Sequence, residues 1–198
     1  MYPFEFYLKL GFEHIANLNG YDHILFLIVL CAVYQIKHWR KILILVTAFT
    51  IGHSITLFLV SLNFLSIPSK VIKLLIPITI LVTSLHNIMG TKQMEINSRM
   101  GGKYFMALFF GLIHGMDFSN YFRALIMSPD EIVIPLLGFN IGIELGQLLI
   151  VFFIVLISFI FLNIIKVKHY KWNLFISFVG PFFCVLANND CRKSEMAF

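Results

Sequence analysis

Residues 132–163 read IVIPLLGFNIGIELGQLLIVFFIVLISFIFLN, and Glu144 is the only charged side chain among them. A helix that crosses the hydrocarbon core of a bilayer, roughly 30 Å thick, needs about 20 consecutive apolar residues. This stretch is longer, so we predict a tilted helix, or one that begins with a bent turn near Pro135. Its length and hydrophobicity indicate a membrane-spanning segment.

The composition of the whole chain agrees with that segment. Of 198 residues, 59% are hydrophobic and only 13% are charged, with a mean hydropathy of +0.88. Soluble domains carry about 25% charged residues, so disorder is excluded and an integral membrane protein is predicted. The net charge of +5 does not indicate nucleic acid, because the basic residues stand in short clusters between apolar segments. We therefore expect the lipid bilayer as the surrounding medium and no nucleic-acid partner.

Five further apolar segments are long enough to be candidate spans. They cover residues 21–36, 42–64, 71–90, 103–126 and 172–187. We expect the last to stop at Asn188, Asn189 and Asp190. Residues 3–18 are too short and too charged to span, and predict an interfacial or partly inserted helix. The predicted fold class is all-α: a polytopic helical membrane protein with about six transmembrane helices plus a short N-terminal interfacial helix, in one domain over residues 1–198.

Loop charges predict the orientation. The segments after the first, third and fifth spans hold nine Lys and Arg residues, and the opposite side holds six. Cytoplasmic loops carry the excess of Lys and Arg, so residues 37–41, 91–102 and 166–171 are expected in the cytoplasm. Both termini then face outward.

Ionisable side chains inside the apolar segments are costly and need a reason to be there. His53, His114 and Glu144 fall near the middle of three different spans, and we expect them to meet in one cavity open to the outer face. Residues expected near its outer mouth are His14, Asp22 and His23. Polar neighbours expected to support the cavity are Thr50, Ser54, Asp117, Asn140 and Gln147.

Imidazoles combined with carboxylates are typical ligands of borderline divalent metals such as nickel or zinc. The alternative is an interhelical hydrogen-bond network that only fixes packing. Gly138, Gly142 and Gly146 repeat every four residues, a pattern that allows another helix to pack closely. We expect the many phenylalanines of the spans to face lipid. His38, His86 and His169 are expected to lie outside the site.

No GxSxG, HExxH, P-loop or CxxC motif occurs in the chain. Ser54 directly follows His53, so on a helix their side chains point about 100° apart and form no ready nucleophile–base pair. The sequence therefore favours a protein that is not an enzyme.

Five stretches taken together resemble the HupE/UreJ family of multi-spanning bacterial membrane proteins. They are GFEHI (11–15), GYDHILFLI (20–28), FTIGHSITL (49–57), FGLIHGMDFS (110–119) and FNIGIELGQ (139–147). The resemblance covers residues 5–175. It implies a place in the bacterial cytoplasmic (inner) membrane and a role as a hydrogenase or urease accessory protein, with nickel transport in some members. Partners implied are the metal ion and metalloenzyme maturation proteins, and a homo-oligomer stays open.

Three features depart from the family pattern. Nickel and cobalt permeases proper carry a compact His-x4-Asp-His on one helix, whereas His14 is separated from Asp22 and His23 by Asn17, Asn19 and Gly20. Asp117 stands where a small residue is expected. The tail over residues 179–198 is more polar than the usual apolar end.

Three functions follow in order of preference. The first is a divalent-metal (nickel) permease, in which His14, Asp22 and His23 capture the ion while His53, His114 and Glu144 hold it at mid-depth. The second is a membrane-embedded zinc-dependent hydrolase with Asp117 or Glu144 as general base. The third is a non-catalytic membrane assembly factor. Transport also needs polar groups on the cytoplasmic side, where the sequence offers only Thr83, His86 and Asn87.

Overall fold

A computed structural model describes residues 4–17, 21–65, 67–90, 100–125 and 132–196, without the side chains of 185 and 187–196. These residues form helices and no strands. The α-helices are α1 (Phe4–Ala16), α2 (Tyr21–Cys31), α3 (Trp39–Ser61), α4 (Ser69–Gly90), α5 (Met100–Leu125), α6 (Val133–Phe159) and α7 (His169–Met196). A short 3-10 helix, η2 (Ile36–His38), precedes α3, and a short π-helix, η4 (Ile160–Ile164), follows α6.

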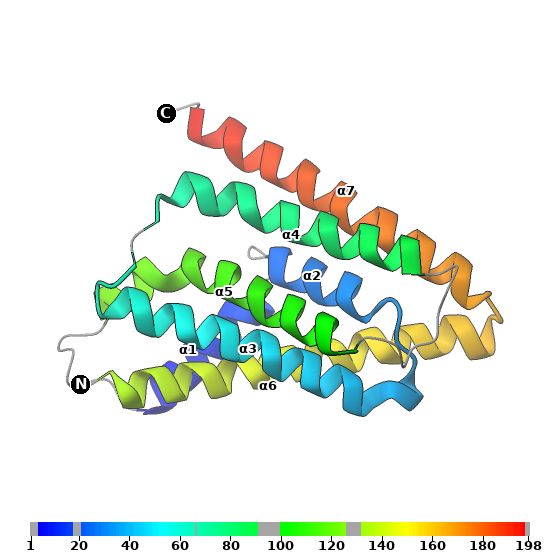
Figure 1. Cartoon of the computed structure of the whole chain (residues 1–198), viewed down its shortest axis with the longest axis horizontal. Helices are drawn as coiled ribbons and strands as arrows, with labels where there is room; N and C mark the ends of the chain where they lie inside the picture. Colours follow the sequence, from blue (N-terminus) through cyan, green and yellow to red (C-terminus); the bar gives the residue numbers. More distant parts are fainter. Residues whose placement is uncertain (1–3, 18–20, 66, 91–99, 126–131, 197–198) are drawn as a thin grey trace.

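The helices alternate in direction along one bundle (Figure 1). α2, α4 and α6 run one way, and α3, α5 and α7 run the other. The end at which α3 and α7 begin carries Lys37, Arg40, Lys41, Lys166 and Lys168, and we call it the basic end. The described parts of the three segments expected in the cytoplasm lie toward this end, while residues 91–99 fall outside the described residues.

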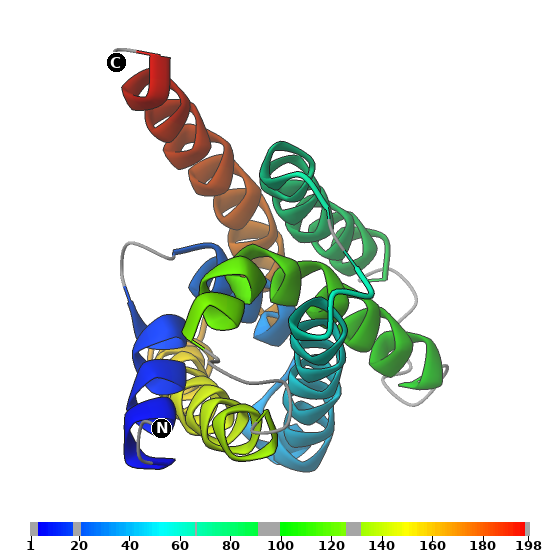
Figure 2. The same ribbon diagram turned by 90° about the vertical axis from the view of Figure 1, so that its left-hand side faces the viewer.

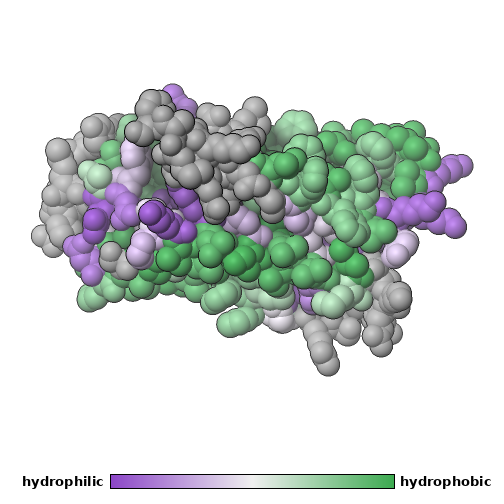
Figure 3. Space-filling view, turned by 90° about the horizontal axis from the view of Figure 1, so that it is seen from above, coloured by the Kyte–Doolittle hydropathy of each residue, from purple (hydrophilic) through white to green (hydrophobic). Residues whose placement is uncertain are grey.

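Seen along the bundle, α4 and α7 lie together on one side, with α1 and α6 together on the other (Figure 2). α3 and α5 form the closest pair between them. Buried apolar side chains fill the space between these layers, with Phe26, Phe49 and Ile80 at 0–1% exposure. Hydrophobic side chains cover the middle of the visible face, and hydrophilic ones gather toward both ends (Figure 3).

Three described segments are long and apolar enough to cross a membrane: Ile36–Ser61, Ser69–Gly90 and Val133–Ile164. Their many outward-facing Ile, Leu and Phe side chains suit contact with lipid. Helices lie at all six predicted positions, but among the described residues this criterion does not confirm the number of six spans.

The first predicted span is shorter than expected. α2 ends at Cys31 instead of continuing to residue 36, and Ala32, Val33 and Tyr34 are buried in non-helical backbone. With a rise of about 1.5 Å per residue, α2 extends only about 16 Å, roughly half of the hydrocarbon thickness. It does not span by itself.

α1 supplies the missing length. The packing agrees with the predicted partly inserted helix and not with an interfacial one, because α1 lies lengthwise against α6 and runs in the same direction as α2 (Figure 1). α1 and α2 therefore follow one another along the bundle as two short helices, and we call this pair, interrupted after Ala16, the broken helix. Tyr7 and Ile15 are 2% and 0% exposed, so α1 is held within the bundle by burial of its apolar face.

Glycines explain how α1 comes so close to α6. A Cβ at Gly11 would collide with the carbonyl oxygen of Phe139, and one at Gly142 with that of Leu8. The glycine repeat of α6 thus accommodates a second helix, as the sequence predicted, and its partner is α1.

The last helix is longer than predicted. α7 starts at His169 and passes through Asn188, Asn189 and Asp190 to Met196. The expected stop was wrong, because polar residues of this kind weaken a helix only by tenths of a kcal/mol each and do not break it.

Candidate metal centre

Close packing of α3 against α5 positions two of the predicted histidines. Gly52 faces the backbone of Leu108, and Gly111 faces that of Phe49, so neither position has space for a Cβ. His53 and His114 follow these contact points and are both 0% exposed. The approach of the two backbones therefore fixes the imidazoles within the bundle.

The break between α1 and α2 positions the other two predicted histidines, His14 and His23. His14 lies in the last turn of α1, and His23 lies in the first turn of α2 beside Asp22. His23 is 2% exposed. Both histidines are thus at helix ends inside the bundle, where an interruption brings two half-helices to one place.

The four imidazole rings form one cluster. Ring centroids of His14 and His23 are 4.8 Å apart, those of His23 and His114 are 5.2 Å apart, and those of His14 and His53 are 5.7 Å apart. His23 and His53 are 6.0 Å apart. The sequence had predicted an outer set and a mid-depth set, but the broken helix carries His14 and His23 to the level of His53 and His114.

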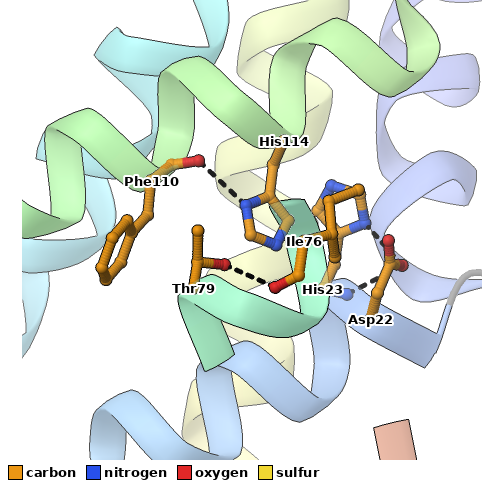
Figure 4. Close-up of polar contacts among 6 residues, drawn as sticks. All are labelled: Asp22, His23, Ile76, Thr79, Phe110 and His114. Carbon is orange, nitrogen blue, oxygen red and sulfur yellow. Dashed lines mark hydrogen bonds and ion pairs between the residues drawn. The ribbon is translucent and has the colours of Figure 1, made fainter. Parts of the chain in front are cut away.

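Two rings are oriented by partners that only accept hydrogen bonds. His23 Nδ1 lies 3.2 Å from Asp22 Oδ1, and His114 Nδ1 lies 2.9 Å from the carbonyl oxygen of Phe110 (Figure 4). Each Nδ1 therefore carries the proton, which leaves Nε2 of the neutral ring with an available lone pair. Metal-binding histidines commonly show this arrangement, with one ring N–H held by a carboxylate or a backbone carbonyl.

Five of the six remaining ring nitrogens have no hydrogen-bond partner among the described residues. Nε2 of His14, His23 and His114 and both nitrogens of His53 are buried without a hydrogen bond. A buried polar atom without a partner costs free energy of about 1–3 kcal/mol. Five such atoms in one cluster indicate that a ligand completes the site.

The ring spacing fits a shared metal ion. Imidazoles that bind one tetrahedral ion through bonds of about 2.0–2.1 Å have ring centroids about 5 Å apart. The observed spacings of 4.8, 5.2, 5.7 and 6.0 Å are near this value. The side-chain orientations are not those of a bound ion, since no three His, Cys, Asp or Glu residues of the described ranges meet that geometry. Binding of one ion by these histidines therefore requires their side chains to reorient.

Glu144 points to a different partner. Its Oε1 accepts a hydrogen bond of 2.6 Å from Thr47 of α3. One turn further along both helices, the Thr50 hydroxyl lies 2.9 Å from Oε1 of Gln147, which is 0% exposed. Glu144 and Gln147 therefore join α6 to α3 beside the histidine cluster.

The other polar residues that the sequence predicted as supports of the cavity differ in their surroundings. Ser54 donates to the carbonyl oxygen of Thr50 at 2.7 Å, within its own helix. Asn140 is half-buried, and its Oδ1 has no partner. Asp117 has an exposed side chain one turn beyond His114. Of the predicted residues, the structure brings together His14, Asp22, His23, His53 and His114.

Phenylalanines enclose the cluster on both sides. Toward the basic end lies a first layer, formed by Phe26, Phe49 and Phe110. Toward the opposite end lies a second layer, formed by Phe118, Phe122 and Phe139. His114 contacts Phe26 and Phe49 with centroids 5.1 and 5.2 Å away, and His14 contacts Phe118 at 4.2 Å. Phenylalanine rings thus contact the histidines on both sides along the bundle, while His14 stays partly exposed.

The sequence prediction that phenylalanines face lipid was wrong for five of these six positions, and Phe118 is half-buried. Phe26, Phe49, Phe122 and Phe139 are 0–1% exposed, whereas Phe105 and Phe152 do face outward at 67% and 60%. Spacing offered a signal, because Phe49, Phe110 and Phe118 each lie four residues from a cluster histidine, which is one turn on the same helix face.

Comparison with known proteins places the chain in a family. No curated protein and no solved structure matches it. The family model described as HupE / UreJ protein matches residues 1–186, a range that includes the broken helix, the four histidines and both phenylalanine layers. On this match, which confirms the resemblance seen in the sequence, the chain belongs to the HupE/UreJ family.

Proposed function

We propose that this protein is a membrane permease for a divalent transition-metal ion, with nickel as the first candidate. The observation that supports it best is the convergence of four imidazoles, three of them fully buried, at the interruption between α1 and α2. Discontinuous helices with a site at their interruption are typical of transporters, because the unwound segment brings helix ends to the middle of the bundle. Membership of a family associated with nickel or metal uptake and accessory roles agrees with this function.

In this proposal His14, His23, His53 and His114 are the ligands. Asp22 holds the proton on Nδ1 of His23 and supplies negative charge beside the ion. Imidazole ligands suit nickel and zinc, and the described cluster contains no thiolate or thioether that would favour copper(I). Glu144 acts through its bond to Thr47, by coupling α6 to α3, and not as a ligand.

The two phenylalanine layers give the permease a closed state. An ion at the histidines meets Phe26, Phe49 and Phe110 toward the basic end, and the second layer on the opposite side. Transport then requires one layer to open at a time, as in alternating access. The shortness of α1 and α2 suits this, because two half-helices can tilt separately about the break.

Buried polar side chains of α4 continue toward the basic end. Thr79, Thr83, Ser84 and Asn87 are 2–7% exposed. The hydroxyl of Thr83 bonds to the carbonyl oxygen of Thr79, and Asn87 donates to the carbonyl oxygen of Val29 at 2.8 Å. Thr83, His86 and Asn87 line a pocket beyond the first phenylalanine layer. These groups supply the inner polar route that transport needs.

The alternative of a purely structural network accounts less well for the cluster. A network that fixes packing is stabilised by satisfied hydrogen bonds, as in the pair of Thr50 and Gln147. The histidines instead leave five buried nitrogens without partners. A ligand-binding role explains why these nitrogens have no hydrogen-bond partner, and a packing role does not.

Uptake by the purified protein tests the proposal. Proteoliposomes with a metal-sensitive dye inside should accumulate Ni²⁺ with the wild type and lose that uptake with His114→Ala. His38→Ala is the matched control, because His38 lies in η2, outside both the cluster and the inner polar route, and it should retain most uptake. Metal analysis of the same samples should give about one ion per chain for wild type and control. Equal uptake by His114→Ala and wild type would refute the site.

A further inference from the structure

A polar pocket of about 380 Å³ lies at the basic end, away from the histidine cluster. It opens between the turn that precedes α3 and the segment that joins α6 to α7. The residues that line it are Gln35, Ile36, Lys37, Ser158, Phe159, Leu162, Asn163, Val167 and His169. Its volume is within the range of roughly 300–1,000 Å³ that is typical of small-molecule sites.

Irregular backbone forms the walls of this pocket. Residues Ile36–His38 form a short 3-10 helix, and Ile160–Ile164 form a short π-helix. Ile165 N–H then bonds to Ile160 and Val167 N–H to Phe161, each at 3.0 Å, while Lys166 has a left-handed φ of 59°. Short π-helical segments within α-helices occur frequently at functional sites.

The charge of the pocket is positive. Lys37 lines it, and no acidic side chain is among the described residues of its wall. His169 uses one ring nitrogen for a hydrogen bond with the backbone of Val33, and its buried Nε2 has no partner. Burial lowers the pKa of His169, the bond to Val33 opposes this, and the nearby Lys37 lowers the pKa further. The ring is therefore neutral at pH 7 and offers Nε2 as an acceptor.

An apolar groove of about 440 Å³ continues from the pocket along α3 and α6. Ile36 and Phe159 line both spaces. The remaining lining residues of the groove are Trp39, Ile42, Leu43, Leu148, Val151, Phe152, Val155 and Leu156. Trp39 is 54% exposed beside Arg40, whose guanidinium is 5.3 Å from the ring centroid. Tryptophan with basic residues is typical of the head-group level of a bilayer.

We propose that the pocket and the groove together bind one anionic phospholipid. The phosphate lies at Lys37, a hydroxyl of the head group donates to Nε2 of His169, and one acyl chain follows the groove between α3 and α6. Charge complementarity at one end and continuity with an apolar channel at the other select this occupant. A soluble anion would fill only the pocket, and a neutral lipid would use only the groove. Basic pockets between helices on the cytoplasmic side of membrane proteins bind anionic head groups in the same manner.

Native mass spectrometry of the purified full chain tests the head-group site. Phosphatidylglycerol should bind with a stoichiometry of one and more tightly than phosphatidylcholine. Lys37→Gln should weaken phosphatidylglycerol binding about fivefold, the effect of one cation near an anionic surface. Lys70→Gln, an exposed lysine at the opposite end of the bundle, is the matched control and should leave binding unchanged. Equal binding of the two lipids to the wild type would overturn the proposal.

A second pair of variants tests whether the lipid also occupies the groove. Leu156→Trp places a larger ring in the groove and should also weaken phosphatidylglycerol binding, whereas Leu145→Trp, on the same helix outside the groove, should not. Both leucines are largely exposed, at 43% and 47%, so each variant should fold, which its melting temperature without added lipid verifies. If inorganic phosphate competes fully with the lipid and Leu156→Trp has no effect, the site is one for a soluble anion and the proposal fails.

Discussion

The rings of His14 and His23 lie 4.8 Å apart, centroid to centroid, across the interruption between α1 and α2. In an unbroken helix, residues at this separation in sequence would be more than two turns apart along the axis. The break therefore brings the two histidines together, at the point where Asp22, the neighbour of His23 in sequence, lies 3.2 Å from the His23 ring. This relationship is the basis of the first prediction.

Asp22→Asn should weaken metal binding while it preserves the shape of the site. The asparagine oxygen still accepts from His23, but the negative charge beside the ion is lost. Loss of such an orienting carboxylate typically lowers metal affinity by about 10–100-fold. Isothermal titration with Ni²⁺ measures the change, with Glu13→Gln as an exposed control on α1. Unchanged affinity in Asp22→Asn would mean that His23 is not a ligand.

Metal affinity should fall as the pH is lowered. A ligating imidazole must be neutral, so protons compete with the ion once the pH is low enough to protonate the rings. We expect nearly constant affinity at neutral and higher pH and a steep loss in acid, steeper than one proton gives, because several imidazoles are involved. Titrations at a series of pH values test this. A pH-independent affinity would point to carboxylate ligands instead.

Glu144→Gln should retain metal binding and affect the link between helices. The glutamine oxygen still accepts from Thr47, so we expect a loss of stability of no more than about 1 kcal/mol. Glu144→Ala removes the acceptor and should destabilise more. Thermal unfolding with and without Ni²⁺ separates the two effects. A tenfold or greater loss of Ni²⁺ affinity in Glu144→Gln would restore Glu144 to the ligand set.

Gly11→Ala should destabilise the bundle, because the added methyl would collide with the carbonyl oxygen of Phe139. The cost should be about 1–3 kcal/mol, as for overpacking in a core. Gly101→Ala is the matched control, since nothing lies within 4 Å of its Cβ position. Alanine in that open helical position should be neutral or slightly stabilising. Equal melting temperatures of the two variants would contradict close packing of α1 on α6.

Phe118→Ala should open the cluster from the side of the second phenylalanine layer. Its ring lies 4.2 Å from His14 and stacks on Phe139 at 4.9 Å, so its removal leaves a gap in this layer. Stopped-flow measurements should show faster Ni²⁺ binding and release, with a smaller change in equilibrium affinity. Phe152→Ala, 60% exposed on α6, should not alter the rates. Unaltered rates in Phe118→Ala would show that the layer does not control access.

The sequence by itself determined the class of the protein and most of its helices. Apolar residues at 59% and sparse charge are typical of helices in lipid, and the apolar runs locate α3, α4, α5 and α6 within a few residues. It also singled out His53 and His114, because an imidazole in an apolar run is costly wherever the helix lies.

Only the tertiary structure decided which side chains meet. The break after Ala16 depends on α6 accepting α1 along its glycines, a contact between segments far apart in sequence. The same packing turned Glu144 to Thr47 and buried phenylalanines that composition assigned to lipid. A local pattern gives the period of a helix but not its rotation, which is set by its neighbours. Which residues form the site could therefore be determined only from the packed helices.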